Sequence, residues 1–243
     1  MLKKQGLSIF FPCYNDAGTI ASLVVLADRT ARQFTNNFEI IIVNDGSSDH
    51  SKYVLEELQK IYKNLRVIEH KKNRGYGGAL RSGFKAASKE LVFYTDGDYQ
   101  YDVTEMGLLY SKMKPGIDWV NGWKKRRNDA WYRKVIGNLY NLGVKTLFNI
   151  KIKDIDCDYR LIRKSALDKV DLVFDSGVIC LELIKKLQLA GCKAAEAPVN
   201  HFFRSYGKSQ FFNFRRIFRT FYNLLQLWVY IYIKKSYKGS RNK

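Results

Sequence analysis

The chain has 243 residues, a length that allows one large domain or a domain with an extension. Hydrophobic residues make up 46%, which is enough for a substantial core and too many for a disordered chain. The 42 Lys and Arg residues outnumber the 23 Asp and Glu residues, giving a formal charge of +19. That charge indicates an anionic partner, which could be nucleic acid, a phosphate-bearing substrate or an anionic membrane.

The cysteine spacing and the first residues of the chain bear on the cellular compartment in which the protein is expected. No close Cys-x-x-Cys pair occurs, which argues against a disulfide framework and against a zinc knuckle. Residues 1–6 contain no apolar core of signal-peptide length. The longest nearly apolar run, Leu224–Ile233, is shorter than the roughly 20 residues that a membrane-spanning helix needs. We therefore expect a cytosolic protein that can still touch a membrane surface.

In chain order, the first hundred residues alternate between strand and helix patterns. Short apolar runs predict strands at Leu7–Phe11, Glu39–Val43, Leu65–Glu69 and Leu91–Thr95. Helical spacing of apolar residues predicts helices at Ala17–Phe34, Ser51–Tyr62 and Gly78–Ser88. This alternation predicts an α/β fold whose mostly parallel sheet is covered by helices.

The second half is less regular. We expect strands at Ile117–Asn121 and Lys193–Val199, and helices at Tyr132–Phe148 and Ser176–Ala190. Between them, the stretch 124–134 carries six Lys or Arg residues and one Asp. Glu182 falls in an apolar helical face, where a carboxylate needs a partner. The three histidines fit no metal-ligand spacing, and we expect structural or exposed roles for them.

Polar clusters follow three of the predicted strands, at the edge where ligands of parallel sheets bind. The sharpest cluster is Asp96-Gly97-Asp98-Tyr99-Gln100. Two carboxylates at a strand end can share one Mg²⁺ or Mn²⁺ ion, and the Gln100 amide oxygen could join them. An Asp-Gly turn is the simpler alternative.

The other two clusters at this edge are Pro12-Cys13-Tyr14-Asn15 and Asn44-Asp45-Gly46-Ser47, and a glycine-rich segment precedes a later helix. Asp45 could accept hydrogen bonds from a base or ribose; the alternative is a turn that caps the next helix, a role that Asp49 suits better. The glycines of Asn73–Gly78 would let the backbone approach a diphosphate near a helix N-terminus. This motif is neither a dinucleotide fingerprint nor a P-loop.

Two basic motifs lie later in the chain. Arg160, in Asp154-Ile-Asp-Cys-Asp-Tyr-Arg160, could bind a phosphate or could form a structural pair with an aspartate. The segment Arg204–Ser209 carries Arg204 and Lys208 around a glycine. It could close over a diphosphate leaving group, or it could be a solvated loop.

The C-terminal segment has its own composition. From Asn200 onwards there is no acidic residue, ten residues are Lys or Arg, and 13 of the 35 aromatic residues fall here. Spacings of three and four residues place one apolar stripe on a helix, formed by Phe211, Phe214, Phe218, Phe221, Leu225, Trp228 and Tyr232. This pattern favours an interfacial membrane helix. Packing on the parent domain and a dimer seam are the alternatives.

Together, these motifs resemble the family-2 inverting glycosyltransferases, and among them most closely the dolichyl- and polyprenyl-phosphate sugar transferases. The resemblance covers roughly residues 6–210 and rests on six motifs in the family's order. It implies a GT-A fold, Rossmann-like and nucleotide-binding, as a catalytic domain over residues 1–210. Residues 211–243 would form the basic, aromatic, membrane-associating tail.

The resemblance also implies a role for each motif. Residues that would bind the nucleotide-sugar donor are Pro12, Tyr14, Asn15, Asp16, Asp45, Gly75, Gly78, Asp96, Arg204 and Lys208. A Mg²⁺ or Mn²⁺ ion on the diphosphate would be held by Asp96, Asp98 and Gln100. The acceptor phosphate would meet Arg133 and Arg160, and the catalytic residues would be Asp98, Asp154 and Arg160.

The expected acceptor follows from a missing base. Relatives that glycosylate sugar hydroxyls usually carry a Glu-Asp pair, and no such dipeptide occurs here. A hydroxyl needs a general base, whereas a phosphate monoester is already anionic at neutral pH. We therefore expect transfer of a hexose from a UDP- or GDP-sugar to a polyprenyl phosphate, by a peripheral enzyme on the inner face of the membrane.

Two alternatives remain. One is a glycosyltransferase of the same fold that uses a sugar hydroxyl as acceptor, with an Asp near Asp154 as the base. The other is a basic nucleic-acid-binding protein, which would spread its basic residues over one groove. The sequence does not indicate which nucleotide, which sugar or which lipid length is used, nor the oligomeric state.

Overall fold

The computed structural model describes residues 5–125, 141–204, 206 and 214–234. The strands are β1 (Leu7–Cys13), β2 (Phe38–Asn44), β3 (Leu65–Glu69), β4 (Leu91–Thr95), β5 (Trp119–Lys124), β6 (Tyr159–Arg163) and β7 (Ala194–Val199). The helices are α1 (Ile20–Ala31), α2 (Ser51–Ile61), α3 (Gly75–Ala86), α4 (Met106–Lys112), α6 (Lys164–Leu167), α7 (Val178–Leu189) and α8 (Phe214–Trp228). A 3₁₀ turn, η2 (Val103–Glu105), precedes α4, and a π-helical turn, η3 (Val229–Ile233), continues α8.

Seven strands form one mostly parallel sheet in the order β3-β2-β1-β4-β6-β5-β7. Strands β1 to β4 are mutually parallel, and β5 is parallel to β7. Strand β6 is inserted antiparallel between β4 and β5. The sequence predicted every strand except β6, because its polar residues suggested a binding motif instead of a buried strand.

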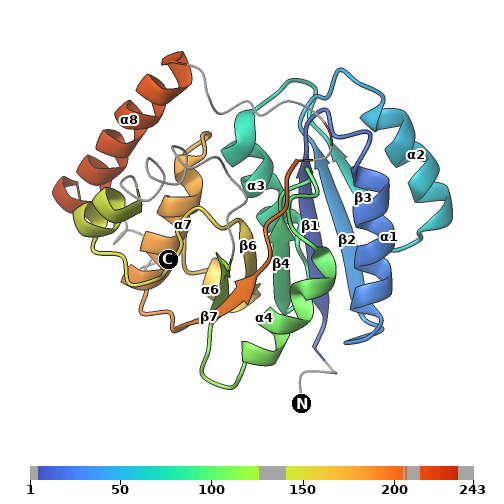
Figure 1. Cartoon of the computed structure of the whole chain (residues 1–243), viewed down its shortest axis with the longest axis horizontal. Helices are drawn as coiled ribbons and strands as arrows, with labels where there is room; N and C mark the ends of the chain where they lie inside the picture. Colours follow the sequence, from blue (N-terminus) through green and yellow to red (C-terminus); the bar gives the residue numbers. More distant parts are fainter. Residues whose placement is uncertain (1–4, 126–140, 205, 207–213, 235–243) are drawn as a thin grey trace.

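Helices cover both faces of the sheet (Figure 1). Along β1, the side chains of Ile9 and Phe11 join a core with α1, α2 and α4, whereas Phe10 joins a second core with α3 and α7. Residues of β2 and β4 divide between the two cores in the same alternating way. Strands buried on both faces explain why their sequences are continuous apolar runs.

Helix α8 lies across α7 on the outer side of the second core (Figure 1). Its inner face places Leu224 and Leu227 in that core, and Ile231 of η3 follows them. Its outer face leaves Phe221 68% and Leu225 60% exposed. The structure therefore shows the helix packed on the parent domain while part of the predicted apolar stripe stays open.

A buried ion pair connects this helix to the loop before α7. Glu182 accepts hydrogen bonds from the backbone nitrogens of Val173 (3.0 Å) and Phe174 (3.1 Å) and pairs with Lys186 at 2.7 Å. The Lys186 ammonium lies 4.7 Å from the ring centre of Tyr230, beyond the end of α8. The expected partner of Glu182 is thus confirmed as Lys186.

Within the described residues, none of the helices is both long enough and apolar enough to cross a bilayer.

Candidate active site

Four aspartates gather where β1, β2 and β4 end. Asp16 follows β1, Asp45 follows β2, and Asp96 and Asp98 follow β4. The loops that carry them are tied together, because the Asn15 side-chain oxygen accepts hydrogen bonds from the backbone nitrogens of Ser48 (2.8 Å) and Asp49 (3.3 Å). The sequence expectation that the polar clusters meet at one edge is therefore confirmed.

The loop that follows β4 lies close against the end of β1. A side chain at Gly97 would collide with the carbonyl oxygen of Pro12, so only glycine fits between Asp96 and Asp98. Thr19 donates a hydrogen bond from its hydroxyl to the Gly97 carbonyl at 2.8 Å. These contacts hold the backbone between Asp96 and Asp98 against the end of β1 and the residue before α1.

The carboxylates at the end of β4 have different partners. Asp96 accepts a 2.6 Å hydrogen bond from the Tyr76 hydroxyl, and Asp98 pairs with Arg204 at 2.5 Å. Burial, together with the negative charges of Asp158 and Asp98, raises the pKa of Asp96 well above its usual range. The Tyr76 hydrogen bond and the charge of Arg204 lower it in part.

This oxygen-rich cluster fits a divalent cation. Carboxylates are the ligands that Mg²⁺ and Mn²⁺ prefer, and a cation would offset the burial and the neighbouring negative charges that raise the Asp96 pKa. Across the described residues, no group of three His, Cys, Asp or Glu side chains is placed to hold a metal. Oxygen atoms of a bound phosphate would therefore have to complete the coordination.

Asp16 and Asp45 are both buried. The Asp16 carboxylate accepts from the backbone nitrogen of Tyr14 at 3.1 Å, and its pKa rises to about 6 chiefly because of burial. Asp45 accepts from His70 at 2.6 Å and from the backbone nitrogen of Arg74 at 2.8 Å. Tyr14, in contrast, is 41% exposed beside them.

The glycine-rich first turn of α3 packs against the loop that precedes α7. Gly75 has a φ of +78°, and its neighbour Gly77 leaves no room for a side chain beside the Phe174 carbonyl. The Gly77 nitrogen donates to the Asp175 carbonyl at 2.9 Å. These glycines thus permit close backbone packing, and the donor-binding roles of Gly75 and Gly78 stay predictions.

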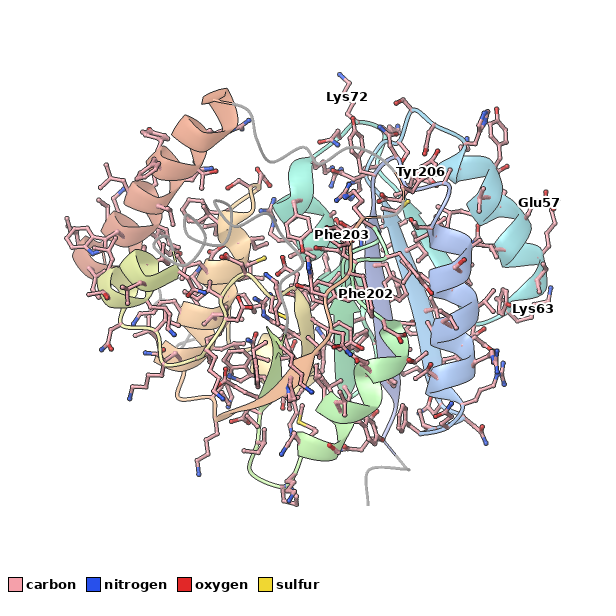
Figure 2. All side chains as sticks on the ribbon, viewed as in Figure 1. Glu57, Lys63, Lys72, Phe202, Phe203 and Tyr206 are labelled. Atoms are coloured by element: carbon pink, nitrogen blue, oxygen red, sulfur yellow. The ribbon has the colours of Figure 1, made fainter. Side chains whose placement is uncertain are left out.

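A strap formed by residues 200–204 and 206 runs from β7 over this edge. Phe202 donates its backbone N–H to the Gln100 carbonyl at 2.8 Å, and the Gln100 amide returns a 3.1 Å bond to the Phe202 carbonyl. Farther along, the Tyr206 ring lies directly over Gly18 at the start of α1. Figure 2 shows Phe202, Phe203 and Tyr206 spread along the strap.

The structure does not support contact of Arg160 with an acceptor phosphate. Arg160 is fully buried in β6, and its guanidinium donates to Asn121, Tyr94, Asp158 and the Ile155 carbonyl. The alternative of a structural pair with an aspartate is the one observed. Because the Arg160 side chain is fully buried among these protein partners, it is not accessible to a ligand at the surface.

Asp154 is also occupied by protein partners. Its carboxylate accepts from the backbone nitrogens of Lys124 (3.3 Å) and Asp156 (3.1 Å), and the Lys124 ammonium lies 3.9 Å away. The side chain is 9% exposed. This environment suits a turn-forming residue better than the predicted catalytic one. Arg133 and Lys208 lie outside the described residues, so their roles remain predictions.

The sequence profile of the family described as "Glycosyl transferase family 2" matches residues 8–171, which include Asp16, Asp45, Asp96 and Asp98. This match spans most of the chain. The chain belongs to glycosyl transferase family 2. The family predicted from the six motifs is thereby confirmed, and the protein is a glycosyltransferase.

Relatives of this glycosyltransferase agree with that assignment. An undecaprenyl-phosphate 4-deoxy-4-formamido-L-arabinose transferase from Proteus mirabilis is 28% identical over 225 residues, covering 92% of this chain and 68% of that protein.

Solved structures share the fold at low sequence identity. One is glucosyl-3-phosphoglycerate synthase from Mycobacterium tuberculosis, in a complex with Mn²⁺, UDP and phosphoglyceric acid (TM-score 0.68, 16% identity, 93% of this chain and 78% of that chain). Another is mannosyl-3-phosphoglycerate synthase from Rubrobacter xylanophilus (TM-score 0.68, 14% identity, 98% and 77%). These similarities confirm the predicted GT-A fold.

Four residues of the glycosyltransferase site escaped the sequence analysis: Tyr76, Asp158, His70 and Tyr206. Tyr76 and Tyr206 lie inside motifs that were singled out for their glycines and cations. Asp158 was one of three neighbouring acids, and nothing in the sequence distinguished it. His70 directly follows β3, so its place at a strand end was the signal that could have found it.

Proposed function

We propose that this glycosyltransferase moves a hexose from a UDP- or GDP-sugar to a polyprenyl phosphate at the inner face of the membrane. The edge formed by Asp16, Asp45, Asp96 and Asp98 would bind the donor. A nucleotide diphosphate fits this edge because the carboxylate pair suits a divalent cation and the strap places Arg204 beside it.

The observation that carries the choice of acceptor is the state of Asp154. A sugar-hydroxyl acceptor needs a base, and the residue expected to act as one is buried and occupied by Lys124 and by a backbone nitrogen. A phosphate acceptor needs no base, since it is ionised at neutral pH. The relative from Proteus mirabilis, whose name states an undecaprenyl-phosphate acceptor, supports this choice.

In the proposed reaction, an oxygen of the acceptor phosphate forms a bond to the anomeric carbon from the face opposite the leaving group. The bond between that carbon and the diphosphate oxygen breaks, and its electron pair leaves with the nucleoside diphosphate. The anomeric configuration inverts, with no covalent enzyme intermediate. Arg204 turns from Asp98 to the diphosphate and stabilises the charge that develops there. When bound, a divalent cation held by Asp96 and Asp98 would supply further positive charge to the same group.

The outer face of α8 would bring the enzyme to its lipid substrate. Phe221, Tyr222 and Leu225 are more than half exposed on this face, and Ile233 of η3 is 63% exposed. No acidic residue occurs after Glu196, so this segment carries no negative side chain that would repel an anionic bilayer. An amphipathic helix of this composition lies in the membrane interface without spanning the bilayer.

The transfer reaction can be tested directly. Purified protein with Mn²⁺, a panel of UDP- and GDP-sugars and undecaprenyl phosphate should give a lipid-linked sugar that mild acid releases, because a glycosyl phosphate is acid-labile. Replacing the lipid with an uncharged polyprenol should abolish the product. An acid-stable glycoside as the only product would instead identify a hydroxyl acceptor and refute the proposal.

The membrane role has a separate test. Co-sedimentation with vesicles containing anionic phospholipid should fall at least about tenfold in the double variant Tyr222→Ser, Leu225→Ser, because two exposed apolar contacts are lost. Tyr53→Ser is the matched control, since Tyr53 is 65% exposed on α2, away from the tail. Equal binding by wild type and the double variant would exclude this face as the membrane contact.

A further inference from the structure

A buried histidine lies behind one carboxylate of the donor edge. His70, directly after β3, is 5% exposed and contacts two side chains at once. Its Nδ1 lies 2.6 Å from Oδ1 of Asp45, and its Nε2 lies 2.8 Å from Oγ of Ser82 in α3. The three side chains therefore form a hydrogen-bonded row from α3 to the end of β2.

The direction of these hydrogen bonds follows from Asp45. An ionised carboxylate only accepts hydrogen bonds, so His70 must carry a proton on Nδ1. In the neutral ring Nε2 is then an acceptor, and the Ser82 hydroxyl donates to it. The same Oδ1 atom also accepts from the backbone nitrogen of Arg74 at 2.8 Å. Two donors from the protein thus hold one oxygen of Asp45.

The second oxygen of Asp45 is left for a ligand. No hydrogen bond to Oδ2 from the described part of the chain is found, whereas Oδ1 has two. A carboxylate directs its two oxygens to different sides, so fixing Oδ1 on the protein side fixes the direction of Oδ2. Asp45 itself lies at the carboxyl end of β2, the edge at which parallel sheets bind their ligands.

We propose that His70 and Ser82 are positioning residues that orient Asp45 to accept a hydrogen bond from the N–H edge of the donor's base. This inference rests on the proposed function, because it requires a nucleotide at this edge. Uracil and guanine both present ring N–H groups, so the chemistry is shared by UDP- and GDP-sugars. Without His70, the Asp45 carboxylate would rotate and the base would lose an aligned acceptor.

The same three residue types could suggest a hydrolytic triad, but the local structure argues against it. Ser82 lies inside α3, so the backbone around it belongs to a regular helix and offers no free pair of N–H groups for an oxyanion. Ser82 borders a cavity of about 540 Å³ whose lining includes Arg74, Arg81 and Lys85, so a small probe can reach it. Because the helix offers no oxyanion site, a fluorophosphonate probe should nevertheless leave Ser82 unlabelled. Stoichiometric labelling would overturn the positioning role.

The decisive experiment measures nucleotide binding by calorimetry with Mn²⁺ and without acceptor. His70→Leu should raise the Kd of the preferred nucleotide, UDP or GDP, at least about tenfold, as expected for losing a hydrogen bond to a charged group. It should leave the Kd of ribose 5-diphosphate, which lacks the base, within about twofold. His70→Asn keeps a donor at the position of Nδ1 and should restore nucleotide binding to within about threefold of wild type.

Serine variants give a second line that does not depend on the histidine variants folding. Ser82→Ala should weaken nucleotide binding by a few-fold, because His70 loses its outer partner. Ser8→Ala is the matched control: Ser8 donates a buried 2.7 Å hydrogen bond to Glu39 at the opposite end of the sheet. Its Kd should equal that of wild type.

Each outcome has one reading. Wild-type protein that binds no nucleotide would refute the proposed function itself. Nucleotide binding by folded His70→Leu equal to wild type, with Ser82→Ala also unchanged, would refute only the positioning role. Equal losses for the nucleotide and for ribose 5-diphosphate would do the same, since they would show a general distortion of the edge.

Discussion

Removing the Arg204 guanidinium should tighten the binding of Mn²⁺ to the nucleotide-free glycosyltransferase. Arg204 pairs with Asp98, one of the two carboxylates expected to hold the cation. A divalent cation must therefore compete with a resident positive charge. In Arg204→Ala this competitor is absent, and the whole charge of Asp98 is open to the metal.

The size of the effect follows from the geometry of the pair. The two groups are 2.5 Å apart, and the Asp98 side chain is 7% exposed whereas that of Arg204 is 29% exposed. Two unit charges about 4 Å apart attract by about 1 kcal/mol in water and by about 4 kcal/mol at an effective dielectric constant of about 20. Solvent access to Arg204 favours the lower part of that range, about 1–2 kcal/mol. The Kd for Mn²⁺ should then fall about 5- to 30-fold.

Electron paramagnetic resonance of free Mn²⁺ measures this Kd without any catalytic turnover. Lys72→Ala is the control. Lys72 is an exposed cation near the same edge (Figure 2), and its substitution removes one positive charge without altering the partners of Asp98. With UDP or GDP present, the effect of Arg204→Ala should reverse, since Arg204 is then needed by the diphosphate. An unchanged or weaker Mn²⁺ affinity in nucleotide-free Arg204→Ala would refute the competition.

Three further predictions follow from buried charges. Asp98→Asn should abolish sugar transfer while leaving the fold intact, because it removes a metal ligand but keeps a side chain of the same size; activity of this variant in EDTA would contradict the metal site. The pKa of Asp16 is raised from 3.8 to about 6, so the folded state holds this proton more tightly than the unfolded state. The stability that this proton contributes is present below about pH 4 and is lost as the pH rises through about 6, a decrease of up to about 3 kcal/mol. In urea titrations of the metal-free protein, Asp16→Asn should not show this decrease. Identical pH profiles for the variant and wild type would refute the prediction. Lys186→Met should cost about 3–5 kcal/mol of unfolding free energy in urea, because Glu182 would stay buried without its cation; a cost below about 1 kcal/mol would contradict that reading.

The sequence predicted the part of the fold that depends on periodicity. Apolar runs located β3 and β4 at their observed boundaries, and β1 extends two residues beyond its predicted end. The predicted strand ended before Pro12, because proline has no backbone N–H to donate to a neighbouring strand. In the structure, Pro12 lies beyond the pairing of β1 with β4 and is paired only with β2, so β1 tolerates it.

Antiparallel β6 and the roles of Arg160 and Asp154 could not be predicted in the same way. Their placement depends on contacts with residues far apart in the chain, such as Asn121 for Arg160. A motif shows which chemical groups are present, but burial decides whether they face a ligand or one another. The acidic pair after β4 was easier, because a strand end and an obligatory glycine both leave a local signature.

The two-sided packing of α8 matters for anyone who shortens the chain to obtain a protein free of lipid. Ending it before residue 214 would remove more than the exposed aromatic face. It would also uncover the apolar surface that Leu224 and Leu227 cover, and it would take away Tyr230 beside Lys186 and the Asn223 hydrogen bond to Ser176. Ser176 lies in the loop before α7, and this loop also carries the Phe174 carbonyl oxygen that lies against Gly77. Gly77 directly follows Tyr76, whose hydroxyl donates a hydrogen bond to Asp96. Solubility is therefore better sought by changing single outward side chains of the helix than by deleting it.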